Sequence, residues 1–142
     1  MRIKLTEQAK NTPGFQIPTK QKKGDAGYDM YLMEDVTFLP GETVKVNMGV
    51  CFETPEGWAG RITLRSSTSL YGLVMQDPLI DSNYRGAVHA IVLNTSNKPV
   101  TFKKGERLCS VFFFPVYDEP LEVVDELSET ERSEQGFGSS GR

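Results

Sequence analysis

Four polar clusters interrupt the apolar stretches of this chain, and two of them combine carboxylates or hydroxyls with glycine or arginine. The segment GDAGYD (24–29) places Asp25 and Asp29 in a turn that contains two glycines. The segment RSSTS (65–69) places an arginine before four consecutive hydroxyl residues. Backbone N–H groups and hydroxyls at the start of a helix point outward together and can hold an oxyanion.

The third cluster supplies a candidate general base and an aromatic ring, and the fourth is a flexible arm. The segment LIDSNYRG (79–86) carries Asp81 and Tyr84 on a tight turn between apolar stretches. The end of the chain, ERSEQGFGSSGR (131–142), is rich in glycine and serine, which is typical of a linker, yet it contains arginine and one phenylalanine. Taken singly, each cluster has an ordinary explanation in turn or linker chemistry.

In the segments between these clusters, apolar residues recur at every second position. In residues 44–52, apolar side chains alternate with Lys45, Asn47, Gly49 and Cys51, which predicts one half-buried strand, and GRITLRS (60–66) repeats the pattern. Turn sequences punctuate the chain at 39–42, 54–57, 94–99 and 103–106. Short strands at this spacing predict an all-β sandwich or barrel. We expect little helix: one short helix opening at 68–71, with Thr68 or a neighbouring serine as N-cap.

Two segments are apolar at nearly every position: AVHAIVL (87–93) and LCSVFFFPV (108–116). A strand covered on one side alternates, so these runs predict strands buried on both faces. The second cover is either a central position in the sheet or an interface between subunits.

Length and charge predict one domain of residues 1–117 followed by an arm of residues 118–142. Residues 1–117 contain 14 Lys and Arg against 11 Asp and Glu, whereas residues 118–134 contain eight acids and one arginine. This mildly basic body lacks the concentrated basic stripe of a nucleic-acid-binding protein, so we expect no nucleic-acid partner. No apolar run approaches a membrane span, so we expect no membrane contact either.

The two cysteines, Cys51 and Cys109, have no metal-ligand spacing. They predict two reduced, buried thiols in an intracellular, cytoplasmic protein.

Taken together and in order, five segments closely resemble the motifs of the trimeric dUTPases. They are DAGYDMY, GRITLRSS, LIDSNYRGAV, KKGERLCSV and RSEQGFGSSG, and they span residues 24 to 141. The resemblance implies a jelly-roll-like β-sandwich and a homotrimer with a swapped C-terminal arm. It implies hydrolysis of dUTP to dUMP and pyrophosphate, with Mg²⁺ bound mainly through the triphosphate.

The resemblance also implies roles in the third motif. Asp81 would be the general base for the attacking water, and Tyr84 would pack against deoxyribose and exclude a 2′-hydroxyl. The backbone around Leu79, Ile80 and His89 would read uracil; for His89 we expect the backbone, not the imidazole, to act.

In the first two motifs the resemblance implies a phosphate and metal end of the site. Ser66 and the Ser67 amide would hold phosphates, while Arg65 would either join them or fix the motif. Asp29 would hold waters of the Mg²⁺ shell, and Asp25 matches less tightly and is expected to be structural.

The fifth motif would close over bound substrate as a lid. In this arm Arg132 would pair with the γ-phosphate and Phe137 would lie over uracil. The remaining contacts, from Gly138, Ser139 and Ser140, would wrap the phosphate oxygens.

The chain departs from the family pattern at several contacts. Ser110 stands where a glutamine usually meets the phosphates, so this contact is either lost or bridged by water. Pro78 replaces a glycine and has no N–H to donate. Serine or glutamine also replaces glycine at Ser67, Ser133 and Gln135.

Three alternative functions fit parts of the same sequence. A dCTP deaminase shares the sandwich but needs a glutamate on the strand after the third motif, where this chain reads AVHAIVLN without an acid. A non-catalytic jelly-roll module for binding or a capsid is disfavoured by the intact Asp81, Tyr84, Arg132 and Phe137. A dUTPase with an added regulatory role in protein binding stays open as an alternative.

Overall fold

Eleven strands and two one-turn helices make up the computed structural model, which describes residues 1–130 and 133. The helices are α1 (Glu7–Lys10) and α2 (Ser66–Ser69). The strands are β1 (Arg2–Leu5), β2 (Tyr28–Tyr31), β3 (Val36–Phe38), β4 (Thr43–Asn47), β5 (Val50–Glu53), β6 (Trp58–Leu64), β7 (Leu73–Gln76), β8 (Leu79–Ile80), β9 (His89–Asn94), β10 (Val100–Phe102) and β11 (Arg107–Pro115). Within the described part of the chain, no helix is long and apolar enough to cross a membrane.

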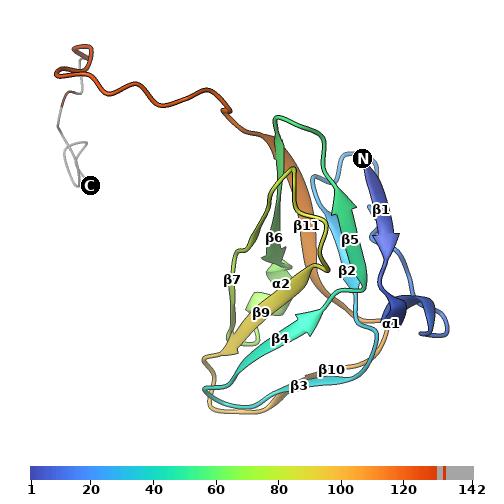
Figure 1. Ribbon diagram of the computed structural model, residues 1–142. Helices are drawn as coiled ribbons and strands as arrows, with labels where there is room; N and C mark the ends of the chain where they lie inside the picture. Colours follow the sequence, from blue (N-terminus) through green and yellow to red (C-terminus); the bar gives the residue numbers. More distant parts are fainter. Residues whose placement is uncertain (131–132, 134–142) are drawn as a thin grey trace.

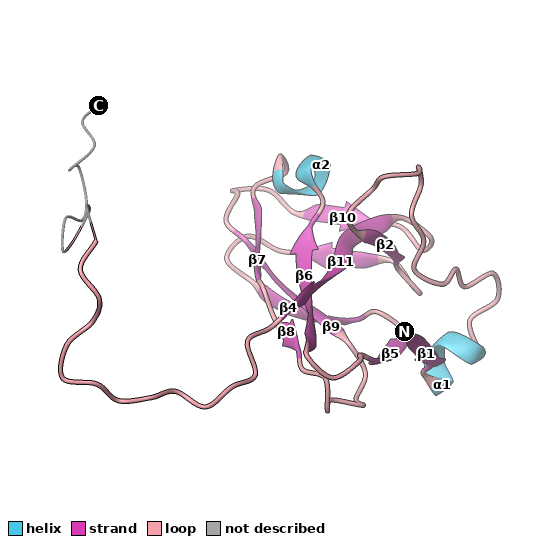
Figure 2. Cartoon of the chain, turned by 90° about the horizontal axis from the view of Figure 1, so that it is seen from above, coloured by secondary structure: helices cyan, strands magenta, loops and turns pink. Residues whose placement is uncertain are grey.

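All strand pairs between these elements are antiparallel. A four-stranded sheet has the order β2-β11-β6-β8, a three-stranded sheet has the order β4-β9-β7, and two ribbons pair β1 with β5 and β10 with β3. Apolar side chains from both larger sheets form one buried cluster, to which Ile62 and Val111 contribute from one sheet and Ala90 and Val92 from the other. Figures 1 and 2 show the strands arranged around this common interior. The predicted all-β sandwich is confirmed.

The alternating segment 44–52 forms two strands, and the prediction of one strand is wrong. Gly49 has a φ of +78°, a left-handed conformation that ends β4 and lets β5 begin in another sheet. A Cβ at this position would lie 2.7 Å from the Phe15 ring, so only glycine fits the corner.

The predicted helix exists but begins earlier than expected. Helix α2 starts at Ser66, and Arg65, not Thr68 or a serine, is the N-cap residue, without a side-chain capping bond. Thr68 lies within α2 and is buried. Arg65, directly after β6, has an extended backbone, and its side chain forms an ion pair with Asp29. Helix α1 was not predicted; its N-cap is Thr6, whose hydroxyl accepts from the Ala9 N–H.

The two apolar runs form central strands, as one of the predicted arrangements required. Strand β9 lies between β4 and β7, and β11 lies between β2 and β6. In β9, however, burial alternates, and His89, Ile91 and Leu93 are only partly covered in the single chain. The second face of β9 is therefore available for a ligand or another subunit.

Both cysteines are free, but only one is fully buried. Cys109 lies in the core, where burial and then the negative charge of Asp29 raise the pKa of its thiol. Cys51 is only partly buried, so the expectation of two buried thiols is wrong for this residue.

After β11 the chain leaves the sandwich. Residues 116–130 contain no helix or strand and run away from the body of the molecule, as Figure 1 shows. Apolar side chains in this segment are exposed, among them Leu121, Val123 and Leu127. The division into residues 1–117 and 118–142 stays a prediction.

Candidate active site

One group of polar side chains lies where β2, β11 and the end of β6 meet, centred on Asp29. Arg65 donates from Nε to Asp29 Oδ1 at 3.2 Å, and Arg107 donates from Nη1 to Oδ2 at 2.9 Å. The Ser110 hydroxyl donates to Oδ1 at 2.8 Å, because Asp29 and Ser110 are paired in register across β2 and β11. One carboxylate thus faces two guanidinium groups, so the cluster keeps a net positive charge.

In this cluster Ser110 makes a contact that the sequence did not indicate, and Arg107 joins the candidate site. The Ser110 hydroxyl donates to Asp29, and the expectation that its phosphate contact is either lost or bridged by water stays a prediction. Arg107 was missed, although it stands in the motif KKGERLCSV. Only the pairing of β11 with β2 reveals that its guanidinium reaches Asp29.

The first residues of α2 extend the positive cluster. Ser66 and Ser67 are exposed and directly follow Arg65. The first N–H groups of any helix have no partner within it, so these amides and hydroxyls are open to an anion held beside the two arginines.

Asp29 has little capacity left for a metal ion. Three donors already occupy three of the roughly four acceptor positions of its carboxylate. Across residues 1–130 and 133, no group of three or more His, Cys, Asp and Glu side chains is placed to hold a metal. Asp25 accepts from the N–H groups of Gln21 and Lys22 in its own turn, as expected of a structural residue.

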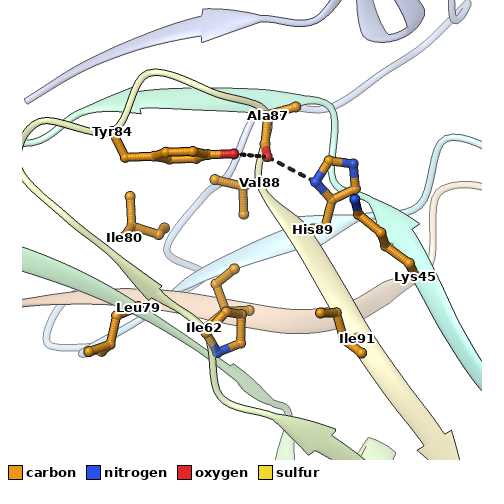
Figure 3. Close-up of a pocket in the computed structure, with 10 residues that line it drawn as sticks. Lys45, Ile62, Leu79, Ile80, Tyr84, Ala87, Val88, His89 and Ile91 are labelled. Carbon is orange, nitrogen blue, oxygen red and sulfur yellow. Dashed lines mark hydrogen bonds between the residues drawn. The ribbon is translucent and has the colours of Figure 1, made fainter.

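A second feature is a cavity of about 200 Å³ between β8, the segment that connects it to β9, and the outer face of the β4-β9-β7 sheet. Figure 3 shows its walls, in which Leu79, Ile80 and His89 of the predicted uracil-reading backbone take part. Lys45 of β4 also lines the cavity and was not predicted to; in the β4–β9 pair it lies opposite Ile91, which lines the same cavity. The full lining is Lys45, Ile62, Pro78, Leu79, Ile80, Tyr84, Ala87, Val88, His89 and Ile91.

Tyr84 is held in one position at the wall of this cavity. Its hydroxyl donates to the carbonyl oxygen of Ala87 at 3.2 Å. The ring lies directly against the backbone of Gly86, where an added Cβ would be 2.3 Å from the Tyr84 hydroxyl and 2.5 Å from Cζ. Gly86 is therefore required by close approach of the ring.

Asp81 lies on the turn that follows β8 and is exposed. Its carbonyl accepts from the Tyr84 N–H at 3.1 Å, which ties the two residues of the third motif together. The side chain borders a separate groove of about 360 Å³. This groove is lined by Trp58, Ala59, Leu79, Asp81, Ser82, Asn83, Phe114, Val116 and Asp118.

Asp81 and the arginine cluster lie at opposite ends of β6. Ile80 of β8 is paired with Gly60, so Asp81 follows near Ala59, whereas Arg65 comes directly after the other end of β6. Six residues of extended strand span about 20 Å. Figure 2 shows α2 and β8 at opposite ends of the molecule. A single copy therefore does not bring these two groups together.

The predicted lid residues lie outside the described part of the chain. They are Arg132, Phe137, Gly138, Ser139 and Ser140.

Comparisons with known proteins agree on one family. A family model for dUTPase matches residues 14–141. The deoxyuridine 5′-triphosphate nucleotidohydrolase of Caldanaerobacter subterraneus is 37% identical over 146 residues, covering 99% of this chain and 97% of its own. The corresponding Monkeypox virus protein is 35% identical over 139 residues, covering 98% and 88%. Among solved structures, the dUTPase of Staphylococcus bacteriophage 80alpha with dUPNHPP has a TM-score of 0.88 at 27% identity, covering 99% of this chain and 98% of its own.

Proposed function

The chain belongs to the dUTPase family, and from this we propose that it is a dUTP diphosphatase that hydrolyses dUTP to dUMP and pyrophosphate. The observation that carries the proposal is the wall of the 200 Å³ cavity, where the Tyr84 ring lies on Gly86 with its hydroxyl on Ala87. A ring fixed in this way suits recognition of a deoxynucleoside. The carboxylate of Asp81, three residues earlier, could then act as the general base beside it.

At the nucleoside end, shape would provide specificity. The Tyr84 ring would pack against deoxyribose, and a 2′-hydroxyl would meet the ring, which disfavours UTP. Backbone groups of Leu79, Ile80 and His89 would pair with the polar edge of uracil. Pro78 has no backbone N–H, so the donors to uracil would have to come from its neighbours.

At the phosphate end, charge would provide binding and alignment. A triphosphate carries about four negative charges, and in-line displacement depends on positioning and charge stabilisation. Arg65, with the hydroxyls and amides of Ser66 and Ser67, would contact phosphate oxygens. Arg107 would support Arg65 through the carboxylate that they share.

Asp81 would act as the general base. A water oxygen attacks the α-phosphorus while Asp81 accepts a proton from that water. As the new P–O bond forms, the bond from the α-phosphorus to the oxygen bridging to the β-phosphate breaks, and pyrophosphate leaves with that oxygen. The products are dUMP and pyrophosphate.

We propose that the site is assembled between copies in a homotrimer. The roughly 20 Å between Asp81 and Arg65 along β6 supports this, because the α-phosphate must lie close to both groups. One copy would then supply the cavity and Asp81, a second the arginine cluster, and a third the C-terminal arm.

The described residues fit Mg²⁺ only in an outer role. Asp29 has about one free acceptor position, which suits a water of the Mg²⁺ shell better than direct ligation. Bound through the triphosphate, Mg²⁺ would neutralise part of its charge. The main task of Asp29 is to hold the two arginines.

Replacing Asp29 by asparagine tests this assignment. Without the carboxylate charge, Arg65 and Arg107 lose their shared partner, so we expect the free energy of unfolding to fall by about 1–3 kcal/mol and the KM for dUTP to rise. Chemical denaturation and steady-state kinetics across a Mg²⁺ titration measure both. Asp35→Asn is the matched control, because Asp35 pairs with Lys103 at the surface and should change neither quantity appreciably. Full recovery of Asp29→Asn by excess Mg²⁺, with unfolding unchanged, would instead assign Asp29 to the metal.

Gly86→Ala should damage substrate recognition without unfolding the protein. The new methyl group would lie 2.3 Å from the Tyr84 hydroxyl oxygen, too close for both to fit, and would displace the ring. A displacement of about 1 Å in a positioning group costs roughly 100-fold in rate, and we expect a fall of that order in kcat/KM for dUTP, with weaker discrimination against UTP. Kinetics with both nucleotides test this. Unchanged kinetics would show that the Tyr84–Gly86 contact does not position substrate.

The proposed function itself is tested by pyrophosphate release from dUTP, dCTP, dTTP and UTP, each with Mg²⁺ and with EDTA. We expect a strong preference for dUTP that depends on Mg²⁺. Release of ammonia from dCTP would identify a deaminase instead. Equal rates on all four nucleotides would contradict the proposed recognition of uracil and deoxyribose.

A further inference from the structure

Two side chains converge on the carbonyl oxygen of Ala87. The Tyr84 hydroxyl donates to it at 3.2 Å, and His89 Nδ1 lies 2.9 Å from the same oxygen. Figure 3 shows the Tyr84 ring and the imidazole on either side of this carbonyl, both at the cavity wall. A carbonyl oxygen has two lone pairs, so these two contacts use both.

The partner fixes which imidazole nitrogen carries a proton. A carbonyl oxygen only accepts hydrogen bonds, so Nδ1 of His89 must be the donor. Both the neutral Nδ1–H tautomer and the imidazolium supply this donor.

The His89 contact is the better of the two hydrogen bonds. An O–H···O bond is usually about 2.7–2.8 Å long and an N–H···O bond about 2.9–3.0 Å. The Tyr84 contact at 3.2 Å is thus long for its type, whereas the His89 contact at 2.9 Å has the usual length. His89 is also anchored by pairing with Asn47 of β4, while Tyr84 stands on the loop and is 45% exposed.

We propose that His89 is a positioning residue for nucleoside selection, which rests on the proposed function. Through its hydrogen bond to the Ala87 carbonyl, the imidazole holds the turn of residues 84–88 against the start of β9. The Tyr84 ring then stays against Gly86 and closes the sugar side of the cavity. The sequence indicated only a backbone role for His89; the geometry assigns its side chain an indirect one.

Three substitutions of His89 distinguish this role from direct contact with substrate. His89→Leu removes the donor. His89→Asn places an amide N–H near the position of Nδ1, and His89→Gln places it nearer to that of Nε2. We expect His89→Leu and His89→Gln to raise the KM for dUTP about five- to tenfold, as expected for one lost hydrogen bond. In both, kcat should change less than KM and the preference for dUTP over UTP should fall, whereas His89→Asn should restore most of both.

A double-mutant cycle tests the shared carbonyl. Tyr84→Phe keeps the ring and removes only its hydroxyl. If Tyr84 and His89 hold the same oxygen, the combined loss in His89→Leu/Tyr84→Phe should differ from the sum of the single losses. Additive losses would mean that the two contacts act independently and would overturn the shared role.

The outcomes separate this inference from the proposed function. A wild-type protein that does not hydrolyse dUTP would contradict the proposed function. A wild type that does, with His89→Leu equal to it in KM and selectivity, would overturn only the role of His89. Recovery by glutamine but not asparagine would instead place the imidazole in direct contact with the nucleotide. Calorimetric binding of dUMP to each variant gives the same comparison without turnover.

Discussion

Asp81→Asn is expected to lower kcat for dUTP hydrolysis by about two to four orders of magnitude, the usual contribution of a general base. Asparagine keeps the size of the side chain and its turn, since the Asp81 contact to Tyr84 is made by the backbone carbonyl. The variant loses only the ability to accept a proton from water. The KM should therefore change much less than kcat, and pyrophosphate release over a range of dUTP concentrations measures both.

Asp118 offers a control for this experiment in the same groove. Both carboxylates line the 360 Å³ groove beside Trp58 and Phe114. If Asp81 acted only through its negative charge in the groove, removal of the Asp118 charge in Asp118→Asn would also lower kcat. We expect Asp118→Asn to behave as wild type. An Asp81→Asn protein that keeps full turnover would rule out Asp81 as the base.

The fold was predictable to the level of class because its signal is local. Alternation in GRITLRS reflects which face of that strand is buried. The apolar runs at 87–93 and 108–116 form strands in the middle of their sheets, although in the single chain burial alternates along β9 and is incomplete along β11. The break at Gly49 was missed because period two continues through the corner: Met48 and Val50 are both buried, although β4 and β5 join different sheets. Alternation reports burial and not sheet membership.

The sequence grouped candidate site residues only where a single motif contains them. Asp81, Tyr84 and Gly86 lie within six residues of sequence, and the structure holds them close together. Arg107 and Ser110 contact Asp29 from 78 and 81 residues away in the sequence, because β11 is paired with β2. Ser110 was interpreted by the residue that it replaces, whereas its actual contact depends on what lies opposite it.

Removal of the end of the chain after Glu131 is expected to lower turnover by about 100-fold or more. This change deletes Arg132 and Phe137, which we propose to pair with the γ-phosphate and to lie over uracil in a site of another copy. Loss of one group that stabilises transition-state charge typically costs 100- to 1,000-fold, and loss of base stacking weakens binding further. Pyrophosphate release by the truncated and full-length chains at equal concentration measures the effect.

The oligomeric state separates a lid from a structural arm. The sandwich surfaces and residues 116–130 are retained in the truncated chain, so sedimentation velocity should give the same oligomeric state as for the full-length protein, which we propose to be a trimer. Phe137→Trp should keep most activity and Phe137→Ala should lose much of it, because stacking needs an aromatic face and not a particular ring. Full activity after truncation would contradict the lid. A truncated chain that becomes monomeric would show that the arm holds the subunits together, and the loss of turnover would then follow from separating Asp81 of one copy from Arg65 of another.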